Sequence, residues 1–147
     1  MAVQTGSGRK VPGVLMFRVE ASLLYFNTDH VRATVWETIR SAACPVKLVI
    51  IDLSNAPSVD MAGARMLATL HADLTKAGAI LRLVAAHGSV RDMLRAEGLE
   101  QQVGDISRRV SADDVIATYL HEVDSEATVP AAPASKTADG SGDAGHG

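Results

Sequence analysis

The sequence predicts an α/β domain built on a mixed β-sheet of four or five strands with about four helices. Short apolar runs alternate along the chain with segments whose apolar residues recur about every three to four positions, a pattern typical of parallel strands joined by helices. Two apolar runs, at 14–19 and 23–26, instead follow one another closely and predict an antiparallel hairpin. This hairpin makes the predicted sheet mixed.

The first helix is expected directly after the hairpin. Residues 20–22 are expected to turn the chain between the two runs, and Asn27 or Thr28 can cap the helix, with Asp29 favourable in its first turn. The apolar face of this helix consists of Val31, Val35, Ile39 and Ala42.

A buried strand and a long helix follow. Pro45 precedes the near-continuous apolar run from Val46 to Ile51, which predicts a strand buried on both faces. The helix is predicted from about Asp60 to Ala77 and ends at Gly78. Its apolar face consists of Gly63, Met66, Leu67, Leu70 and Leu74.

The elements after this helix are shorter. Ile80 to Ala85 predicts a strand, and a short helix is expected from residue 88 or 89 until Gly98 stops it. A short extended piece is expected near Val103. Ser111 to Asp114 has the Ser-x-x-acid capping pattern and predicts a last helix. The residues of that helix expected to face inward are Val115, Ile116, Tyr119, Leu120 and Val123.

The domain boundaries follow from composition. Residues 1–10 are small and polar, and residues 125–147 are rich in Ala, Gly, Ser, Pro and Asp without any periodicity. Neither segment can bury enough apolar surface to offset the entropy of ordering, so both are predicted to be disordered. One domain is therefore expected over residues 11–124.

Composition also excludes several classes of protein. A net charge of −3 provides no basic field for nucleic acid, and 3% aromatic residues are too few for a base-stacking platform. The single cysteine, Cys44, cannot form an internal disulfide. No apolar run approaches the roughly 18–20 residues of a membrane span, and Met1 to Lys10 lacks the apolar core of a signal peptide. We therefore expect a soluble, cytosolic chain.

No motif in the chain indicates catalysis. The sequence contains no phosphate-binding loop, no dinucleotide-binding fingerprint and no zinc-ligand spacing. Asp52 and Asp60 flank one loop and could act as an acid and a base, but Asp52 fits a ligand of loop N–H groups and Asp60 fits a helix cap. Ser54 and Ser58 have no base at a defined offset and fit turn formation. The sequence predicts that the chain is not an enzyme and holds no metal.

The stretch from Asp52 to Gly63 is the candidate ligand site. The end of a buried strand leads through a polar loop into a helix N-terminus, which directs N–H groups and a positive dipole end at one place. The carboxyl ends of parallel strands share one edge of a sheet, so the segments after the other strands are expected nearby. The candidate residues are Asp52, Ser54, Asn55, Ser58, Asp60, Ala62, Gly63, Phe26, Asn27, His87 and Gly88. For His87 an exposed loop position is the expected alternative, and for Phe26 a core position.

Two segments resemble the STAS domain, the module shared by sulfate transporters and anti-sigma factor antagonists. Pro12 to Asn27 resembles the opening of the cytoplasmic STAS domain of SulP-type anion transporters. Val49 to Ser54, followed by Val59 to Gly63 and Leu67, resembles the loop and helix characteristic of STAS domains in general. The resemblance covers Val11 to Val123 and implies a mixed sheet with helices packed mainly on one face.

The resemblance also bears on the site. Anti-sigma factor antagonists carry a phosphorylatable serine directly before the glycine that corresponds to Gly63, whereas this chain has Ala62 there. The departure favours a transporter domain. The family also implies weak binding of GTP or GDP, with Ser54, Asn55, Ser58, Ala62 and Gly63 near the phosphates. Asp52 and Asp60 would repel phosphate unless a cation intervened.

The sequence therefore predicts a cytoplasmic regulatory and docking domain of a SulP-type sulfate (anion) transporter, located on the cytoplasmic side of the cell membrane. The expected partner is the transmembrane domain of the same transporter, and a cytosolic regulatory protein and a nucleotide are further candidates. No nucleic acid partner and no required cofactor are expected, with GTP or GDP as the candidate regulatory ligand. The alternative is a stand-alone signalling module of the anti-sigma factor antagonist type.

Overall fold

The computed structural model describes residues 3–5, 11–104, 106 and 110–128 of the chain. It divides into two units, Met1–Ile116 and Ala117–Gly147, and the sheet lies in the first. Over these described ranges, no helix is long and apolar enough to cross a membrane.

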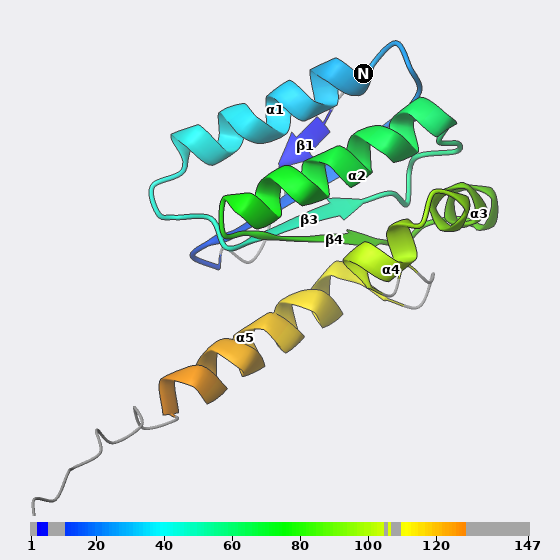
Figure 1. Cartoon of the computed structure of the whole chain (residues 1–147). Coiled ribbons are helices and arrows are strands. Elements are labelled where there is room, and N and C mark those ends of the chain that lie inside the picture. Colours follow the sequence, from blue (N-terminus) through cyan, green and yellow to red (C-terminus); the bar gives the residue numbers. More distant parts are fainter. Residues whose placement is uncertain (1–2, 6–10, 105, 107–109, 129–147) are drawn as a thin grey trace, which may run out of the picture. The chain divides into compact units, whose positions relative to one another are not determined.

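The described part of the first unit contains a mixed sheet of four strands, as the sequence predicts (Figure 1). The strands are β1 (Val3–Thr5), β2 (Val14–Val19), β3 (Leu48–Asp52) and β4 (Ile80–Val84), and they are ordered β1-β2-β3-β4. β2, β3 and β4 are parallel, and β1 is antiparallel to β2. The parallel strands all end at one edge, where the loops of the candidate site begin.

The predicted hairpin between 14–19 and 23–26 is wrong. β2 pairs on that side with β1, which lies inside the segment predicted to be disordered, while Leu23 forms a single parallel bridge with Val59. The reason is the side chain of Asn27, which accepts a hydrogen bond from the Leu24 N–H and donates one to the Ser22 carbonyl. These bonds curl the backbone into a turn and remove it from strand pairing. The rest of 1–10 lies outside the described residues.

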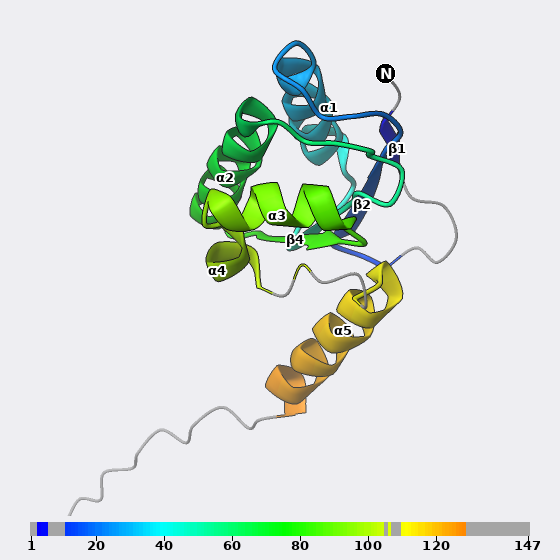
Figure 2. The ribbon, with the colours of Figure 1, turned by 90° about the vertical axis from the view of Figure 1, so that its right-hand side faces the viewer.

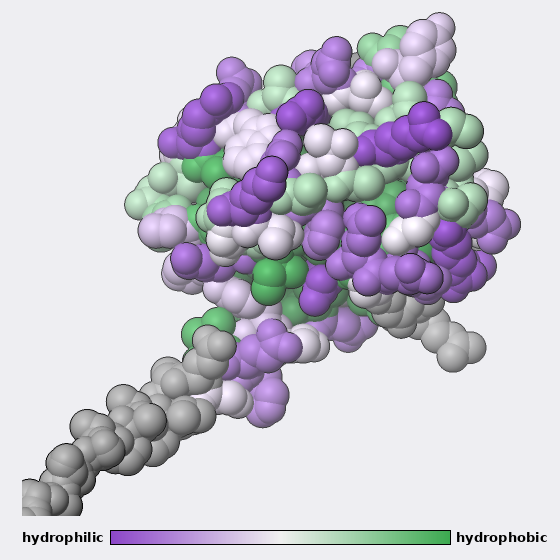
Figure 3. All heavy atoms as spheres, viewed as in Figure 1, coloured by the Kyte–Doolittle hydropathy of each residue, from purple (hydrophilic) through white to green (hydrophobic). Residues whose placement is uncertain are grey.

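Two long helices, α1 (Thr28–Ser41) and α2 (Met61–Lys76), cover the same face of the sheet (Figure 1 and Figure 2). Alternate strand residues point toward them, because successive side chains of a strand point to opposite faces. The buried residues of this core include Phe17, Val19, Val49, Ile51, Leu81 and Leu83 from the strands and Val31, Val35, Leu67, Leu70 and Leu74 from the helices. The predicted packing of helices on one face is confirmed. Hydrophilic side chains spread over the outer face of both helices (Figure 3).

Two short helices complete the core of the first unit. α3 (Gly88–Ala96) begins as predicted, but α4 (Leu99–Val103) replaces the extended piece expected near Val103. Leu99 and Val103 are both fully buried, and a single helical turn places residues four apart on one face. The Val103 carbonyl also accepts a hydrogen bond from Arg82 in β4 at 3.0 Å.

The last helix, α5 (Ala112–Thr128), starts with the predicted cap. The Asp114 N–H donates to the Ser111 hydroxyl, and the Asp114 carboxylate accepts from both the N–H and the hydroxyl of Ser111. The helix continues past residue 124 into the segment predicted to be disordered, whose remainder, 129–147, lies outside the described residues. None of the helix's described side chains is fully buried, but Val115, Ile116, Tyr119 and Leu120 of the predicted inward face are half-buried, whereas the residues between them are exposed. Val123, the last residue of that face, is 40% exposed.

Candidate functional site

The candidate site is built from the segments that follow β2, β3 and β4. The segment after β2 and the loop after β3 are joined at Leu23, whose N–H donates to the Ser58 carbonyl at 2.9 Å. The Asp60 N–H in turn donates to the Leu23 carbonyl at 3.1 Å. The structure therefore brings the predicted loops together at the carboxyl edge of the sheet.

Asp52 ends β3 and is 8% exposed. One carboxylate oxygen accepts a hydrogen bond from the Ser54 N–H at 2.8 Å, which turns the chain into the loop. The other lies 3.3 Å from Nε of Arg18, the residue paired with Asp52 across the parallel strands. One oxygen therefore binds a loop N–H group, as predicted, and the other pairs with Arg18.

Asp60 caps α2, as predicted. One carboxylate oxygen accepts from the Gly63 N–H at 2.8 Å, and the other accepts from the Tyr25 N–H at 3.0 Å. A carboxylate at a helix N-terminus interacts favourably with the helix dipole. The side chain of Asp60 thus connects the start of α2 to the turn that precedes α1.

Gly63 is required by close packing at this junction. A Cβ atom at Gly63 would lie 2.5 Å from the Leu23 carbonyl oxygen and 3.1 Å from both Leu23 Cγ and Val59 Cγ1. Ala62, which precedes it, is half-buried and carries no hydroxyl. The first turn of α2 therefore lies directly against the segment after β2.

The other loop residues are also engaged with one another. Asn55 donates to the Glu20 carboxylate at 2.7 Å, and the hydroxyls of Ser58 and Ser22 lie 2.9 Å apart. The ring Nε2 of half-buried His87 lies 2.5 Å from the Ser54 carbonyl oxygen, and Gly88 begins α3. These bonds tie the three loops to each other, and among the described residues no group of three or more His, Cys, Asp or Glu side chains is placed to hold a metal ion.

Phe26 and Asn27, neighbours in the sequence, have different roles. Asn27 is 7% exposed and holds the turn, whereas Phe26 is 69% exposed. Tyr25 is 74% exposed, and its ring packs edge-on against Phe26 with centroids 5.5 Å apart. Met61, the first residue of α2, is 49% exposed. Phe26 is therefore not a core residue.

Sequence reasoning left Tyr25 and Met61 out of the candidate site. The signal that could have identified Tyr25 was its place directly before a turn. Adjacent residues of a strand point to opposite faces of the sheet, so Tyr25 and Phe26 can share one exposed surface where the strand is interrupted. Asn27, a strong turn former, provides that interruption. For Met61 the only indication in the sequence was its position two residues before Gly63, which faces inward. That position did not show whether the Met61 side chain is exposed or buried.

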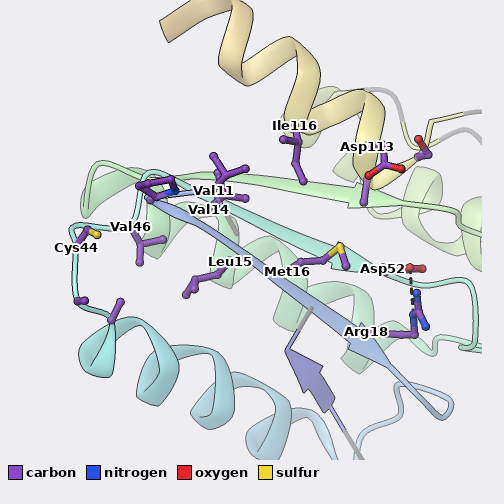
Figure 4. Close-up of a pocket in the computed structure, with 16 residues that line it drawn as sticks. Val11, Val14, Leu15, Met16, Arg18, Cys44, Val46, Asp52, Asp113 and Ile116 are labelled. Carbon is purple, nitrogen blue, oxygen red and sulfur yellow. Dashed lines mark hydrogen bonds and ion pairs between the residues drawn. The ribbon is translucent and has the colours of Figure 1, made fainter. Parts of the chain in front are cut away.

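A cavity of about 660 Å³ lies against β2, in the first unit (Figure 4). Its wall is largely apolar, and the ion pair between Arg18 and Asp52 lies at one end (Figure 4). Residues along it include Val14, Met16, Val46 and Ile116. Asp52 is the one predicted site residue in its lining.

The charges around the junction are mainly negative. Residues 19–31 and 48–64, which form it, contain Glu20, Asp29, Asp52 and Asp60 and neither lysine nor arginine. The arginines that border these ranges, Arg18, Arg32 and Arg65, are paired with the carboxylates of Asp52, Asp73 and Glu97. The surface around the start of α2 is therefore acidic, which opposes direct contact with phosphate.

Comparison with known proteins identifies the family to which this fold belongs. The family model of the STAS domain matches residues 8–113. Sulfate transporter 1.1 of Arabidopsis thaliana is 25% identical over 134 residues, which are 86% of this chain and 21% of that protein. A probable sulfate transporter of Mycobacterium tuberculosis is 22% identical over 97 residues, which are 66% of this chain and 17% of that protein. The chain thus spans about a fifth of the length of these relatives.

Solved structures share the fold at low sequence identity. The murine Slc26a9 anion transporter in its inward-facing state superposes with a TM-score of 0.64 and 21% identity, covering 76% of this chain and 18% of that one. The unphosphorylated anti-sigma factor antagonist SpoIIAA superposes with a TM-score of 0.65 and 17% identity, covering 82% and 97%. Both transporters and antagonists therefore contain this architecture. With the family match across residues 8–113 and a mixed sheet covered by α1 and α2, the chain belongs to the STAS domain family.

Proposed function

We propose that this chain is a regulatory and docking domain of a SulP-type sulfate (anion) transporter and works on the cytoplasmic side of the cell membrane. The observation that carries the proposal is Ala62 at the start of α2, directly before the tightly packed Gly63. A signalling antagonist needs a hydroxyl there to accept phosphate. The nearest candidate in the same loop, Ser58, is engaged with Ser22. The sequence relatives, which are named as sulfate transporters, support the same assignment.

A docking role also agrees with the chemistry of the loops. Asp52 and Asp60 use their carboxylates to hold backbone N–H groups, and Ser54, Asn55 and Ser58 lie in the same hydrogen-bonded junction. Groups held by such bonds form a pre-organised surface, which is the property that a docking site requires. The proposed partner is the transmembrane domain of the same transporter.

Transport measurements test the proposal. Uptake of sulfate would be compared between the full-length transporter and a form lacking residues 11–124, at matched amounts of protein in the membrane. We expect the deletion to change the rate of uptake or the assembly of the transporter. Unchanged uptake with unchanged assembly would refute a regulatory role.

A kinase assay tests the alternative of a stand-alone antagonist. The chain and its Ala62→Ser variant would be incubated with an anti-sigma factor kinase and ATP. We expect no phosphate on the unsubstituted chain, and transfer to it would overturn the assignment. The variant shows whether the kinase is able to recognise the restored hydroxyl.

Weak binding of GTP or GDP at 52–63 stays a prediction. The Gly63 N–H that a phosphate would use is already occupied by Asp60, so binding requires either a cation or displacement of that carboxylate. An amide-resolved NMR titration with GTP, GDP and ATP, with and without Mg²⁺, tests it. Shifts confined to residues 52–63 and 85–89 with Mg²⁺ present are expected, and no shift at any of these amides would exclude nucleotide.

A further inference from the structure

Three exposed apolar side chains gather at the start of α2. Tyr25 and Phe26 form an edge-on pair with 74% and 69% of their surfaces exposed, and Met61 is 49% exposed. Asp60, the residue before Met61, accepts a hydrogen bond from the Tyr25 N–H and so connects the start of α2 to the backbone of the aromatic pair. We call Tyr25, Phe26 and Met61 the aromatic corner. Clustered exposed apolar residues on a soluble fold mark a surface that contacts a partner.

The aromatic corner is held in place by the fold. The backbone of Tyr25 is fixed on both sides, because its N–H donates to Asp60 and its carbonyl accepts from the Thr28 hydroxyl at 3.4 Å. The buried side chain of Asn27 holds the preceding backbone through Leu24 and Ser22. A rigid aromatic surface loses little conformational entropy on binding, which is the property of an interface anchor.

The charges next to the corner indicate the chemistry of the partner. Glu20 and Asp29 flank the aromatic pair in the sequence, and Asp29 is exposed in the first turn of α1. The nearest arginines on the two helices, Arg32 and Arg65, are each paired with a carboxylate, that of Asp73 and that of Glu97. An apolar surface with an acidic border complements an apolar segment that carries lysine or arginine. The same border opposes an anionic bilayer surface, whose negative potential attracts basic rather than acidic segments.

We propose that the aromatic corner is the surface by which this domain docks on the basic, apolar cytoplasmic ends of the transporter's membrane helices. The inference rests on the proposed function and names the contact that the function requires. The cytoplasmic ends of membrane helices combine apolar residues with an excess of lysine and arginine. This composition matches both the apolar centre of the corner and its acidic border.

A peptide titration tests the chemistry on the isolated chain. The probes are a short synthetic peptide with a leucine core flanked by lysines and a matched peptide with glutamates in place of the lysines, followed by amide NMR. We expect the lysine peptide to shift the amides of residues 24–27 and 60–62 and the glutamate peptide to leave them unmoved. Equal binding of both peptides, or shifts confined to another face, would overturn the inference.

Substitutions make the titration specific. Phe26→Ser is expected to weaken the lysine peptide at least about tenfold, because exposed aromatic anchors contribute most of the energy of an interface. Val123→Ser removes an apolar side chain that is 40% exposed on α5 and should leave the affinity unchanged. Equal losses in both variants would show non-specific hydrophobic binding and contradict the assignment.

Photo-crosslinking in the full-length transporter separates this inference from the proposed function. A photoreactive amino acid would be placed at position 26 and, as a control, at the exposed Thr69 of α2. Crosslinks from position 26 to the ends of membrane helices support the inference. Crosslinks to those ends from position 69 but not from 26 keep a docking role and overturn the corner. No crosslink to the membrane domain from either position counts against the proposed function, and capture of lipid or a second copy at position 26 overturns the corner as a protein-docking surface.

Discussion

At the scale of single residues, the junction depends on the absence of one atom. α2 can begin against the segment after β2 only because Gly63 has no Cβ, which leaves room for the Leu23 carbonyl. That carbonyl is also the acceptor for the Asp60 N–H. A change that moves the Leu23 carbonyl would therefore disturb both the packing against Gly63 and the hydrogen bond from the Asp60 N–H.

Gly63→Ala is expected to reduce the free energy of unfolding by about 1–3 kcal/mol, because the new Cβ would lie 2.5 Å from a backbone oxygen that cannot easily move. Urea denaturation measures the loss. Gly88→Ala is the matched control, since the atom nearest to its new Cβ is the end of the Arg91 side chain at 4.0 Å. A loss at Gly63 no larger than at Gly88 would contradict the close approach.

The roles of the two carboxylate oxygens of Asp60 can be distinguished by an isosteric substitution. In Asp60→Asn the remaining oxygen can still cap Gly63, whereas the amide nitrogen cannot accept from the Tyr25 N–H. We expect a small change in the free energy of unfolding and faster hydrogen exchange at the Tyr25 amide, with the Gly63 amide still protected. Loss of protection at Gly63 together with Tyr25 would show that the two bonds do not act separately.

At the scale of elements, helix starts were predictable and the pairing of the sheet edge was not. The caps at Asp60 and Ser111 are local, because a side chain bonds an N–H three residues ahead, and both are confirmed. The antiparallel edge depends on a partner for β2 that competes with the nearest segment. Local hydrogen bonds from Asn27 decided that competition in favour of β1.

The cap of α5 has a defined pH dependence. The N–H and hydroxyl of Ser111 hold the pKa of Asp114 below its ordinary value of 3.8. A lowered pKa means that the carboxylate stabilises the helix start at pH values above the ordinary carboxyl pKa, and that this contribution is lost as the pH falls through the lowered pKa. We expect the amides of 111–115 to shift in this acidic range by NMR.

Asp114→Asn is the control for this titration, because it keeps a side-chain acceptor and removes the charge. The acid-induced shift of the 111–115 amides should then disappear. If the shift persisted in the variant, another group would be responsible for it.

At the scale of the whole molecule, the chain consists of a unit with its own core and a second unit that follows it. Deleting residues 117–147 is expected to change the free energy of unfolding by less than about 1 kcal/mol, because no described side chain of α5 is buried. Urea unfolding can be followed by the fluorescence of Trp36, the single tryptophan, which packs against the core. A large loss of stability would show that the second unit supports the first.

Features of the whole fold also determined how much of the candidate site could be predicted from the sequence. The sequence could place Asp52, Ser54, Asp60 and His87 at one edge of the sheet, because parallel strands end together, and the structure brings their loops into contact. It could not show that Arg18 lies opposite Asp52, since this requires the register between β2 and β3. The exposure of Tyr25 and Met61 likewise follows from the turn at Asn27 and the close approach at Gly63, both of which are tertiary features.

The backbone bonds on either side of Val59 also determine how the domain transmits force. The Leu23 N–H to Ser58 bond and the Asp60 N–H to Leu23 bond lie side by side, so a pull on the segment before α1 loads both at once. The force then reaches α2 at its first turn and acts on a helix of 16 residues. A partner that moved the aromatic corner would therefore displace α2 together with the segment before α1.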